Sequence, residues 1–389
     1  MREIDNNEEF EQWLGSAPEV LPKVAIQSLN LTAYHEQLCN ISTPGSLFLG
    51  CTLTERAAGH IVTTGGVVIP QLEEFLFCVH RARLYKPMEL FKGFDPSHQE
   101  GYYETVDYQI YKQYLAQGRA NPPSIQTTLA RRLHDHSITE ALDDAIANKK
   151  VVAIMGGHSM ERRDPFYSQI ARLSRTLTQK GFLMVSGGGP GAMEATHLGA
   201  FFAARPLKDL EAAIAELSVR PPNAPKGREY ADWDWLHRAW EVAQKFPIPK
   251  GKEEECMSIG IPTWLYGHEP PALFATHIAK YFANSVREDG LLMIAKHGVI
   301  FAPGSAGTTQ EIFQDATQNH YAKSSKLHVS PMILFGKKHW TEVRPVWPLL
   351  QKVTENEVYG ELLALTDNTE EIVRRILNYN PDVYKLWED

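Results

Sequence analysis

Cysteine is scarce in this chain, and its few cysteines form no pattern that would bind a metal or build a disulfide framework. Only four occur among 389 residues, and none belongs to a CxxC pair. Such pairs are typical of structural zinc sites, and dense cysteines are typical of small secreted domains. We therefore expect free thiols and no metal site. The cysteines are Cys39, Cys51, Cys78 and Cys256.

Long apolar runs and an excess of positive charge are also missing. No apolar stretch reaches the roughly 20 residues that a membrane-spanning helix needs. The acidic segment 1–9 lacks the basic and apolar regions of a signal peptide. The formal net charge of −8 disfavours general binding to nucleic acid polymers but leaves local binding of a small anion open. These absences predict a cytoplasmic protein without membrane or nucleic-acid partners.

The first 145 residues carry the weakest signals and form an N-terminal region whose role the sequence does not indicate. The apolar stretches 47–49 and 67–69 are typical of short strands, and glycines separate them. Tyrosines crowd the segment 102–114. We interpret them as the aromatic face of a packed helix. A platform on which nucleobases stack is the alternative interpretation.

From about residue 146 the pattern becomes regular and predicts an α/β fold with a doubly wound parallel sheet. The unalternating apolar runs 151–155 and 182–185 are typical of strands that are buried on both faces. Each is followed by glycines and then by a helical pattern, over 165–180 and 193–204. We expect a helical insertion at about 206–255. Further along we expect strands near 258–262, 297–302 and 332–335 and helices over 273–286 and 369–377.

Two glycine-rich loops follow predicted strands and are the candidates for ligand binding. The first, Gly187–Ala192, satisfies the pattern G-x-G-x-x-A of dinucleotide-binding turns. Such a site also needs an acidic residue about 20 positions later, and Asp209 and Glu211 fall near that distance. Neither of them follows a predicted strand, so a tight turn without a ligand remains an alternative interpretation.

The second loop, Pro303–Thr308, joins a predicted strand to the start of a helix. Unpaired backbone N–H groups and the helix dipole favour an anion at such a position, most often a phosphate. Glu311 falls in the first turns of that helix. An acidic side chain is not needed to bind an anion, so its presence suggests contact with sugar hydroxyls or participation in chemistry.

Together the two loops resemble the LOG family, which includes cytokinin-activating phosphoribohydrolases and is often described as lysine-decarboxylase-like. The family signature P-G-G-x-G-T-x-x-E corresponds to Pro303–Glu311, in which Ser305 replaces the second glycine. The stretch Gly187–Glu194 is similar to the family's branch of bacterial nucleotide 5′-monophosphate nucleosidases. The family's Arg-Lys pair corresponds to Arg287, which is followed by Glu288. The resemblance covers about residues 145 to 377.

This resemblance implies a Rossmann-like domain that hydrolyses the N-glycosidic bond of a nucleoside 5′-monophosphate. The products would be a free base and ribose 5-phosphate, no cofactor would be needed, and the chain would form a homodimer or a higher homo-oligomer. The resemblance implies Glu311 and Arg287 as catalytic residues. The implied substrate-binding residues are Gly188, Gly189, Gly191, Met193, Glu194, Gly304, Ser305, Gly307 and Thr308.

Other activities are compatible with parts of the same sequence. A nucleotide-binding sensor without catalysis could use the same two loops, and an NAD(P)-dependent oxidoreductase could use the first. A pyridoxal phosphate enzyme needs a lysine at its cofactor. The lysines nearest the second loop are Lys296 and Lys323, and neither lies in a glycine loop. We therefore do not expect decarboxylase activity.

Overall fold

Seven parallel strands form the larger of two sheets, and their order explains where the two glycine loops meet. The structure is a computed structural model that describes residues 2–16, 21–72, 74–221, 224–266, 272–322, 328–355 and 357–385. The chain divides into two units, 1–84 with 113–145 and 85–112 with 146–389. Among the described residues no helix is long and apolar enough to cross a membrane.

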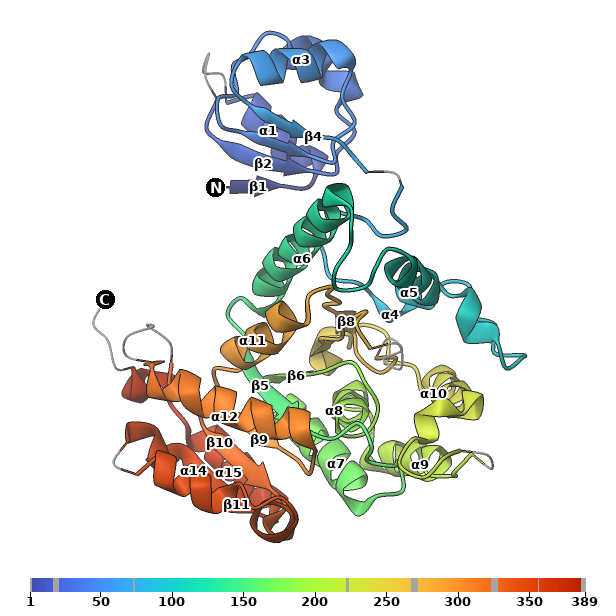
Figure 1. Cartoon of the computed structure of the whole chain (residues 1–389), viewed down its shortest axis with the longest axis vertical. Helices are drawn as coiled ribbons and strands as arrows, with labels where there is room; N and C mark the ends of the chain where they lie inside the picture. The colour runs from blue at the N-terminus through green and yellow to red at the C-terminus, as the bar shows by residue number, and fades with distance from the viewer. Residues whose placement is uncertain are drawn as a thin grey trace. The chain divides into compact units, whose positions relative to one another are not determined.

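The first unit contains a four-stranded parallel sheet in the order β1-β2-β3-β4 (Figure 1). The predicted strands 47–49 and 67–69 are confirmed as β3 and β4. The core of this unit includes Phe10, Ile26 and Phe48, all fully buried. The strands are β1 (Arg2–Ile4), β2 (Val24–Gln27), β3 (Leu47–Leu49) and β4 (Val67–Ile69), and the main helices are α1 (Asn7–Leu14), α2 (His35–Leu38), α3 (Glu55–Thr63) and α6 (Ile125–Ile146).

The second unit contains the seven-stranded sheet in the order β11-β10-β9-β5-β6-β7-β8, with all pairs parallel. Successive strands from β5 to β8 run outward on one side, and β9 then returns to the other side of β5. The strands are β5 (Lys150–Met155), β6 (Phe182–Ser186), β7 (Ser258–Gly260), β8 (His277–Ile278), β9 (Val299–Phe301), β10 (Met332–Phe335) and β11 (Leu363–Thr366).

Helices cover both faces of this sheet, which confirms the predicted α/β doubly wound parallel fold. Helix α7 packs against α8 and α15, whereas α11 packs against α12 and β5 (Figure 1). Each strand from β5 to β7 is almost wholly buried because apolar helices cover it from both sides. The helices of the second unit, of which α5 continues into the first unit, are α4 (Pro87–Leu90), α5 (Val106–Ala116), α7 (Pro165–Gln179), α8 (Ala192–Phe201), α9 (Leu207–Leu217), α10 (Trp233–Lys245), α11 (Asn284–Ile294), α12 (Ala306–His320), α14 (Trp347–Val353) and α15 (Thr369–Asn378).

The predicted helix over 273–286 is wrong. The structure has the short strand β8 at His277–Ile278, and helix α11 begins only at Asn284. Phe274, Ile278 and Phe282 recur every fourth position, a spacing that fits one helix face and equally fits one face of an extended chain. All three are buried, although only Ile278 lies in a strand, with Phe274 in a turn and Phe282 in a bend. Between β6 and β7 the expected insertion contains the helices α9 and α10.

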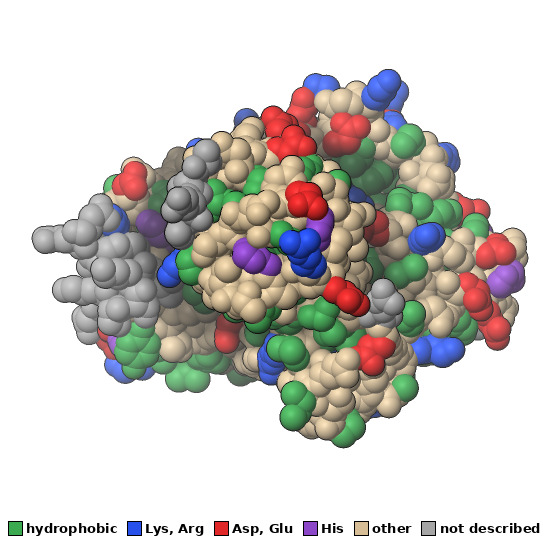
Figure 2. Space-filling view, turned by 90° about the horizontal axis from the view of Figure 1, so that it is seen from above, with side chains coloured by type: hydrophobic (Ala, Val, Ile, Leu, Met, Phe, Trp, Pro, Cys, Tyr) green, Lys and Arg blue, Asp and Glu red, His purple; other side chains and the backbone are tan. Residues whose placement is uncertain are grey.

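Charges are mixed on the face of the molecule that is turned to the viewer in Figure 2. Figure 2 shows one face of the molecule, on which acidic and basic side chains of the described residues lie scattered among hydrophobic and other side chains. Such a face does not have the clustered positive charge with which proteins bind nucleic acid backbones. All four cysteines are free thiols, as predicted.

Candidate functional site

The loops that follow β9, β5 and β6 meet at one edge of the seven-stranded sheet. These strands are neighbours and parallel, so their carboxyl ends lie at the same edge. The order of the strands reverses between β5 and β9, and open α/β sheets bind ligands at such a point. The two glycine loops predicted from the sequence are therefore brought together, one on each side of the loop that follows β5.

Backbone contacts hold these three loops against one another. The Gly157 N–H donates to the Pro303 carbonyl oxygen at 3.0 Å, and the Ala192 N–H lies 3.4 Å from the Gly157 carbonyl oxygen. Gly191 has a φ of +73°, and a Cβ there would lie 2.3 Å from the Gly157 oxygen. A Cβ at Gly156 would lie 2.6 Å from the Cβ of Ala192. Glycine is required at both positions because the loops approach so closely.

Helix α12 begins in the second loop with unpaired amides. Its N-cap, Ser305, makes no side-chain capping bond. The first backbone bond into the helix runs from the Thr309 N–H to the Ser305 oxygen, at 3.0 Å. The N–H groups of Gly307 and Thr308 precede that bond, in the turn whose amides have no intrahelical acceptor. Gly307 is exposed, and a Cβ there would have no neighbouring atom within 4 Å. This helix start is open to an anion.

His339, which the sequence analysis did not single out, lies against the same loop. Its Nε2 is 3.0 Å from the Gly304 oxygen and 3.3 Å from the Gly304 nitrogen. Burial lowers the pKa of this imidazole, so the neutral form is favoured. A protonated Nε2 donates to the oxygen, and a bare Nε2 accepts from the amide. The residue follows β10 and is 35 positions from Gly304 in sequence, so no local signal indicates the contact.

Arg287 and Glu311 lie on the two adjacent helices α11 and α12. Polar contacts join these helices at Gln310 with Glu288 (3.3 Å) and at Gln314 with Asp289. Arg287 is 8% exposed, its guanidinium donates to the Asn284 side chain at 2.9 Å, and its Nε has no partner among the described residues. The predicted helix over 273–286 would have ended just before Arg287, whereas the observed α11 begins at Asn284 and has Arg287 in its first turn.

Asp315 lies one turn after Glu311 on α12 and is 2% exposed. Burial raises the pKa of Asp315 well above its usual value, which favours the neutral carboxylic acid. Residues four apart share one side of a helix, so a charged Asp315 would repel a charged Glu311. The neutral form removes this repulsion.

Glu194, predicted to contact a nucleotide, lies in a buried ion pair in the first turn of α8. Arg162 donates to both carboxylate oxygens, at 2.8 Å from Nε and 2.5 Å from Nη2. The Tyr167 hydroxyl donates to the same carboxylate at 2.9 Å. Arg162 also donates to the Trp235 carbonyl oxygen at 2.8 Å. The Glu194 carboxylate therefore fixes α8 to the loop after β5 and to α10.

The remaining residues of the first loop line its walls. Met193 is half-buried, and a Cβ at Gly187 would lie 2.4 Å from its sulfur. A Cβ at Gly188 would lie 2.4 Å from the Pro262 side chain, which follows β7. Gly189 is buried beside them. This loop is tightly packed against protein, whereas the loop at Gly307 is open.

The acidic partner of a dinucleotide site is not found where the spacing suggested it. Asp209 and Glu211 lie in helix α9, not at the end of a strand. Asp209 pairs with Arg205 at 3.2 Å, and Glu211 pairs with Arg172 at 2.7 Å. Ribose recognition in dinucleotide folds uses an acid that follows the second strand. The arrangement therefore weighs against the oxidoreductase interpretation.

His197 on α8 anchors the first glycine loop from within the core. It is fully buried, with Nε2 3.1 Å from the Gly187 oxygen and Nδ1 3.1 Å from the Ser258 hydroxyl. Because the carbonyl oxygen can only accept, Nε2 carries the proton and Nδ1 accepts from the hydroxyl. Burial lowers the pKa of His197 to about 4.

A pH effect on stability follows from that shift. The unfolded chain binds a proton at this histidine below its ordinary pKa of about 6.5, whereas the folded chain does so only near pH 4. The contribution of His197 to stability is therefore fully present above pH 6.5 and is lost as the pH drops toward 4. We expect His197→Gln to shrink the loss of unfolding free energy between pH 7 and pH 5 by about 2 kcal/mol. Urea titrations at both pH values measure this, and the exposed His136→Gln variant serves as the control. If the unfolding free energy of His197→Gln falls between pH 7 and pH 5 as much as that of the wild type, the lowered pKa of His197 is contradicted.

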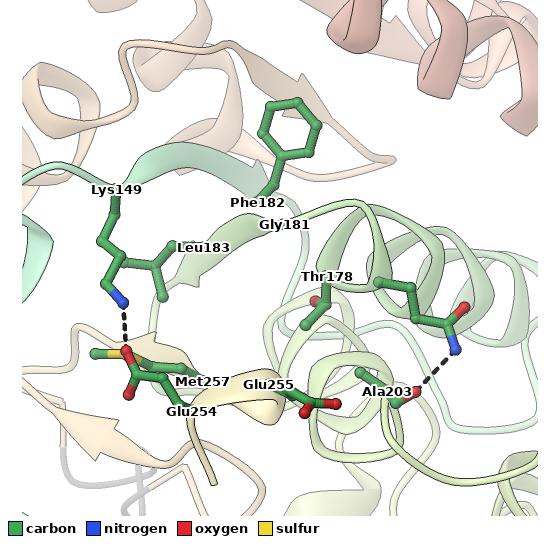
Figure 3. A pocket seen from close by; sticks show the side chains of 10 residues that line it. Lys149, Thr178, Gly181, Phe182, Leu183, Ala203, Glu254, Glu255 and Met257 are labelled. Atoms are coloured by element: carbon green, nitrogen blue, oxygen red, sulfur yellow. Dashed lines mark hydrogen bonds and ion pairs between the residues drawn. The ribbon is translucent and has the colours of Figure 1, made fainter. Parts of the chain in front are cut away.

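A wide pocket occurs at the opposite edge of the sheet, away from the glycine loops. Its lining includes Lys149, Phe182 and Met257, which lie at the amino ends of β5, β6 and β7 (Figure 3). Lys149 forms an ion pair with Glu254 across this pocket (Figure 3). Parallel α/β sheets bind ligands at the carboxyl ends of their strands, so we do not place the candidate site here.

The described residues offer no metal site, and the lysine that a pyridoxal phosphate enzyme needs is not found in either glycine loop. Among the described residues, no three His, Cys, Asp or Glu side chains cluster in a way that would hold a metal ion. Lys323 lies outside the described residues. Lys296 is exposed and lines, together with Asp315, a small cavity of about 120 Å³.

Comparison of the chain with protein-family models and with curated proteins found no match.

Proposed function

We propose that this protein hydrolyses the N-glycosidic bond of a nucleoside 5′-monophosphate and releases a free base and ribose 5-phosphate. The observation that supports the proposal most is the uncapped, exposed start of α12 at the point where the strand order reverses. A phosphate fits a helix start of this kind, and a nucleotide would extend from it along the carboxyl edge of the sheet.

The chemistry requires three functions, and the neighbouring residues could supply them. Water attacks the anomeric carbon, the carbon–nitrogen bond breaks, and the base leaves with a proton that originates from that water. The sugar passes through an oxocarbenium-like state, as in glycoside hydrolysis. In the proposal, the amides of Gly307 and Thr308 bind the phosphate. Glu311 binds ribose hydroxyls, stabilises the cationic sugar and orients the water.

Arg287 would supply a fixed positive charge to the phosphate or the ribose. Its guanidinium is nearly buried, and its Nε has no protein partner among the described residues. A buried donor without a partner costs free energy that a ligand oxygen would recover. Arginine suits this role because its planar donors stay charged at every relevant pH.

The proposal is tested by comparing a nucleotide with its parent nucleoside. We expect the full chain to release base from the monophosphate at least about 100-fold faster than from the nucleoside at equal concentration. This ratio corresponds to about 2.7 kcal/mol, because a bound phosphate helps to orient the sugar at the reacting centre. A panel of nucleoside monophosphates, with chromatography of the released base, measures the rates and the base preference. Equal rates for nucleotide and nucleoside would remove the phosphate from the mechanism.

Gly307→Val and Gly59→Val form a matched pair of variants for this test. Both glycines are exposed in helices, and a Cβ at either position meets no protein atom within 4 Å. Valine at 307 would occupy the space in front of the helix start, so the preference for nucleotide should disappear. Valine at 59 should leave it intact. Ribose 5-phosphate should inhibit the wild-type chain. Binding of nucleotide without base release would instead indicate a sensor.

A further inference from the structure

An aromatic cavity in the second unit is not used by the proposed reaction. It has a volume of about 240 Å³ and lies between the segment 94–108 and the start of α10. Its volume is just below the range of roughly 300–1,000 Å³ that is typical of small-molecule sites. A ligand of one or two fused rings would fit. Its lining includes Tyr102, Tyr103, Tyr108, Arg228, Trp233 and Trp235.

Flat aromatic surfaces line this cavity from both sides. The rings of Tyr103 and Tyr108 are 4.6 Å apart, and those of Tyr102 and Tyr108 are 5.7 Å apart. Tyr103 is 47% exposed and Trp233 is 42% exposed, so large ring faces remain in contact with water. Exposed aromatic faces gathered around a cavity are suited to stacking with a planar ligand.

Buried polar contacts hold both walls in place. On one wall, the Tyr102 hydroxyl donates to Asp107 at 2.7 Å, and Asp107 also accepts from Lys280 at 2.8 Å and from the Trp264 indole at 3.0 Å. On the other wall, the guanidinium of Arg162 lies 4.2 Å from the centre of the Trp235 ring. Such fixed side chains lower the entropic cost of binding a ligand.

One buried donor in the wall has no acceptor. Trp235 is 5% exposed, and its indole N–H makes no hydrogen bond within the described part of the chain. Buried donors in proteins are nearly always paired, because an unpaired one keeps its full desolvation cost. A ring nitrogen or a carbonyl at the edge of a ligand would pair it.

A positive charge lies at the rim of the same cavity. Arg228 is exposed, and its guanidinium forms no ion pair or hydrogen bond with the residues that the structure describes. Its planar donors would match a carboxylate or a phosphate on the ligand. The neighbouring acid, Asp232, accepts from the amide of Asp234 as the N-cap of α10.

We propose that this cavity binds a planar heteroaromatic ring that has a hydrogen-bond acceptor on its edge and an anionic substituent. The rings of Tyr103 and Trp233 stack with the ligand, the Trp235 indole donates to its edge, and Arg228 pairs with its negative charge. This assignment does not depend on the proposed hydrolysis, because it concerns binding alone. The base of a nucleotide and a separate aromatic acid share this chemistry.

The test is a calorimetric titration of the full chain with two probes, adenosine 5′-monophosphate and indole-3-carboxylate. We expect saturable binding of at least one probe. Tyr103→Ala and Trp233→Ala should each weaken binding by roughly 5- to 100-fold, the usual effect of losing one stacking ring. Tyr103→Phe should retain most of the affinity. Trp235→Phe should weaken binding about fivefold through loss of one donor. Tyr321→Ala, at a tyrosine 57% exposed elsewhere, is the matched control.

The outcomes separate the two sources of the ligand and can overturn the proposal. If the substrate's own base occupies the cavity, Tyr103→Ala raises KM for base release and indole-3-carboxylate competes with the nucleotide. If a separate aromatic acid is the ligand, indole-3-carboxylate binds Gly307→Val as tightly as wild type and does not compete. Absence of saturable binding by either probe overturns the assignment. Equal affinities for wild type, Tyr103→Ala and Trp233→Ala overturn it as well.

Discussion

Replacing Glu311 by Gln is expected to slow base release from a nucleoside monophosphate by about 100- to 1,000-fold. Glutamine keeps the size and the hydrogen-bonding capacity of the side chain but removes the negative charge that would stabilise a cationic sugar. One preorganised electrostatic group typically contributes about 2.7–4 kcal/mol to a transition state. Nucleotide affinity should change little, because the phosphate is proposed to bind at the start of α12. Single-turnover rates and calorimetric titration measure the two quantities separately.

The matched control for this experiment is Glu361→Gln. Glu361 is exposed and lies outside α11 and α12. The same chemical change there should leave base release at the wild-type rate. If Glu311→Gln turns over nearly as fast as Glu361→Gln, the carboxylate has no catalytic role, and the proposed mechanism loses its central residue.

The second large effect concerns stability. Glu194→Gln should lower the unfolding free energy by roughly 3–5 kcal/mol, because it leaves the charge of Arg162 buried without its partner. Arg162 and Glu194 have side chains only 2% and 8% exposed. Urea unfolding, followed by the fluorescence of tryptophans such as the nearby Trp235, measures the change.

Glu211→Gln is the comparison for that result. Its ion pair with Arg172 also has a bidentate geometry, but the two side chains are 45% and 39% exposed. Solvent screens an exposed pair, which is typically worth 0–1 kcal/mol. A similar cost for both variants would mean that the buried pair does not stabilise the fold more than an ordinary surface pair.

The parts of the fold that could be predicted from the sequence are segments whose own residues, read in order, indicate the structure. Val151–Met155 and Phe182–Val185 are continuous apolar runs, which occur in strands covered on both faces, and each is followed by glycines that the turn geometry requires. The same features placed both candidate loops at strand ends. Where one apolar spacing fits two structures, as over 273–286, the local signal could not decide between helix and strand.

The features that sequence reasoning missed depend on contacts between distant residues. The contact of His339 with Gly304, the pairing of Arg162 with Glu194 and the aromatic cavity all join segments that follow different strands. A single sequence contains no signal for such pairs. The sequence predicts that Tyr102 and Tyr103 belong to the packed aromatic face of a helix, and the structure places them at the wall of a cavity.

The segment 85–112 also has a consequence for the kinetics of folding. It belongs to the second unit, although residues 113–145 of the first unit separate it from the rest of that unit. The side chain of Lys86 forms a hydrogen bond with that of His277, which lies 191 positions later in the sequence. Asp107 accepts a hydrogen bond from Trp264, which lies 157 positions later. Closing such a long loop costs conformational entropy before the contacts that it brings together can offset that cost. Domains rich in contacts between distant residues therefore fold slowly. During synthesis the segment therefore leaves the ribosome long before its partners. The contacts of Asp107 with Trp264 and Lys280 can form only after those residues have been synthesised.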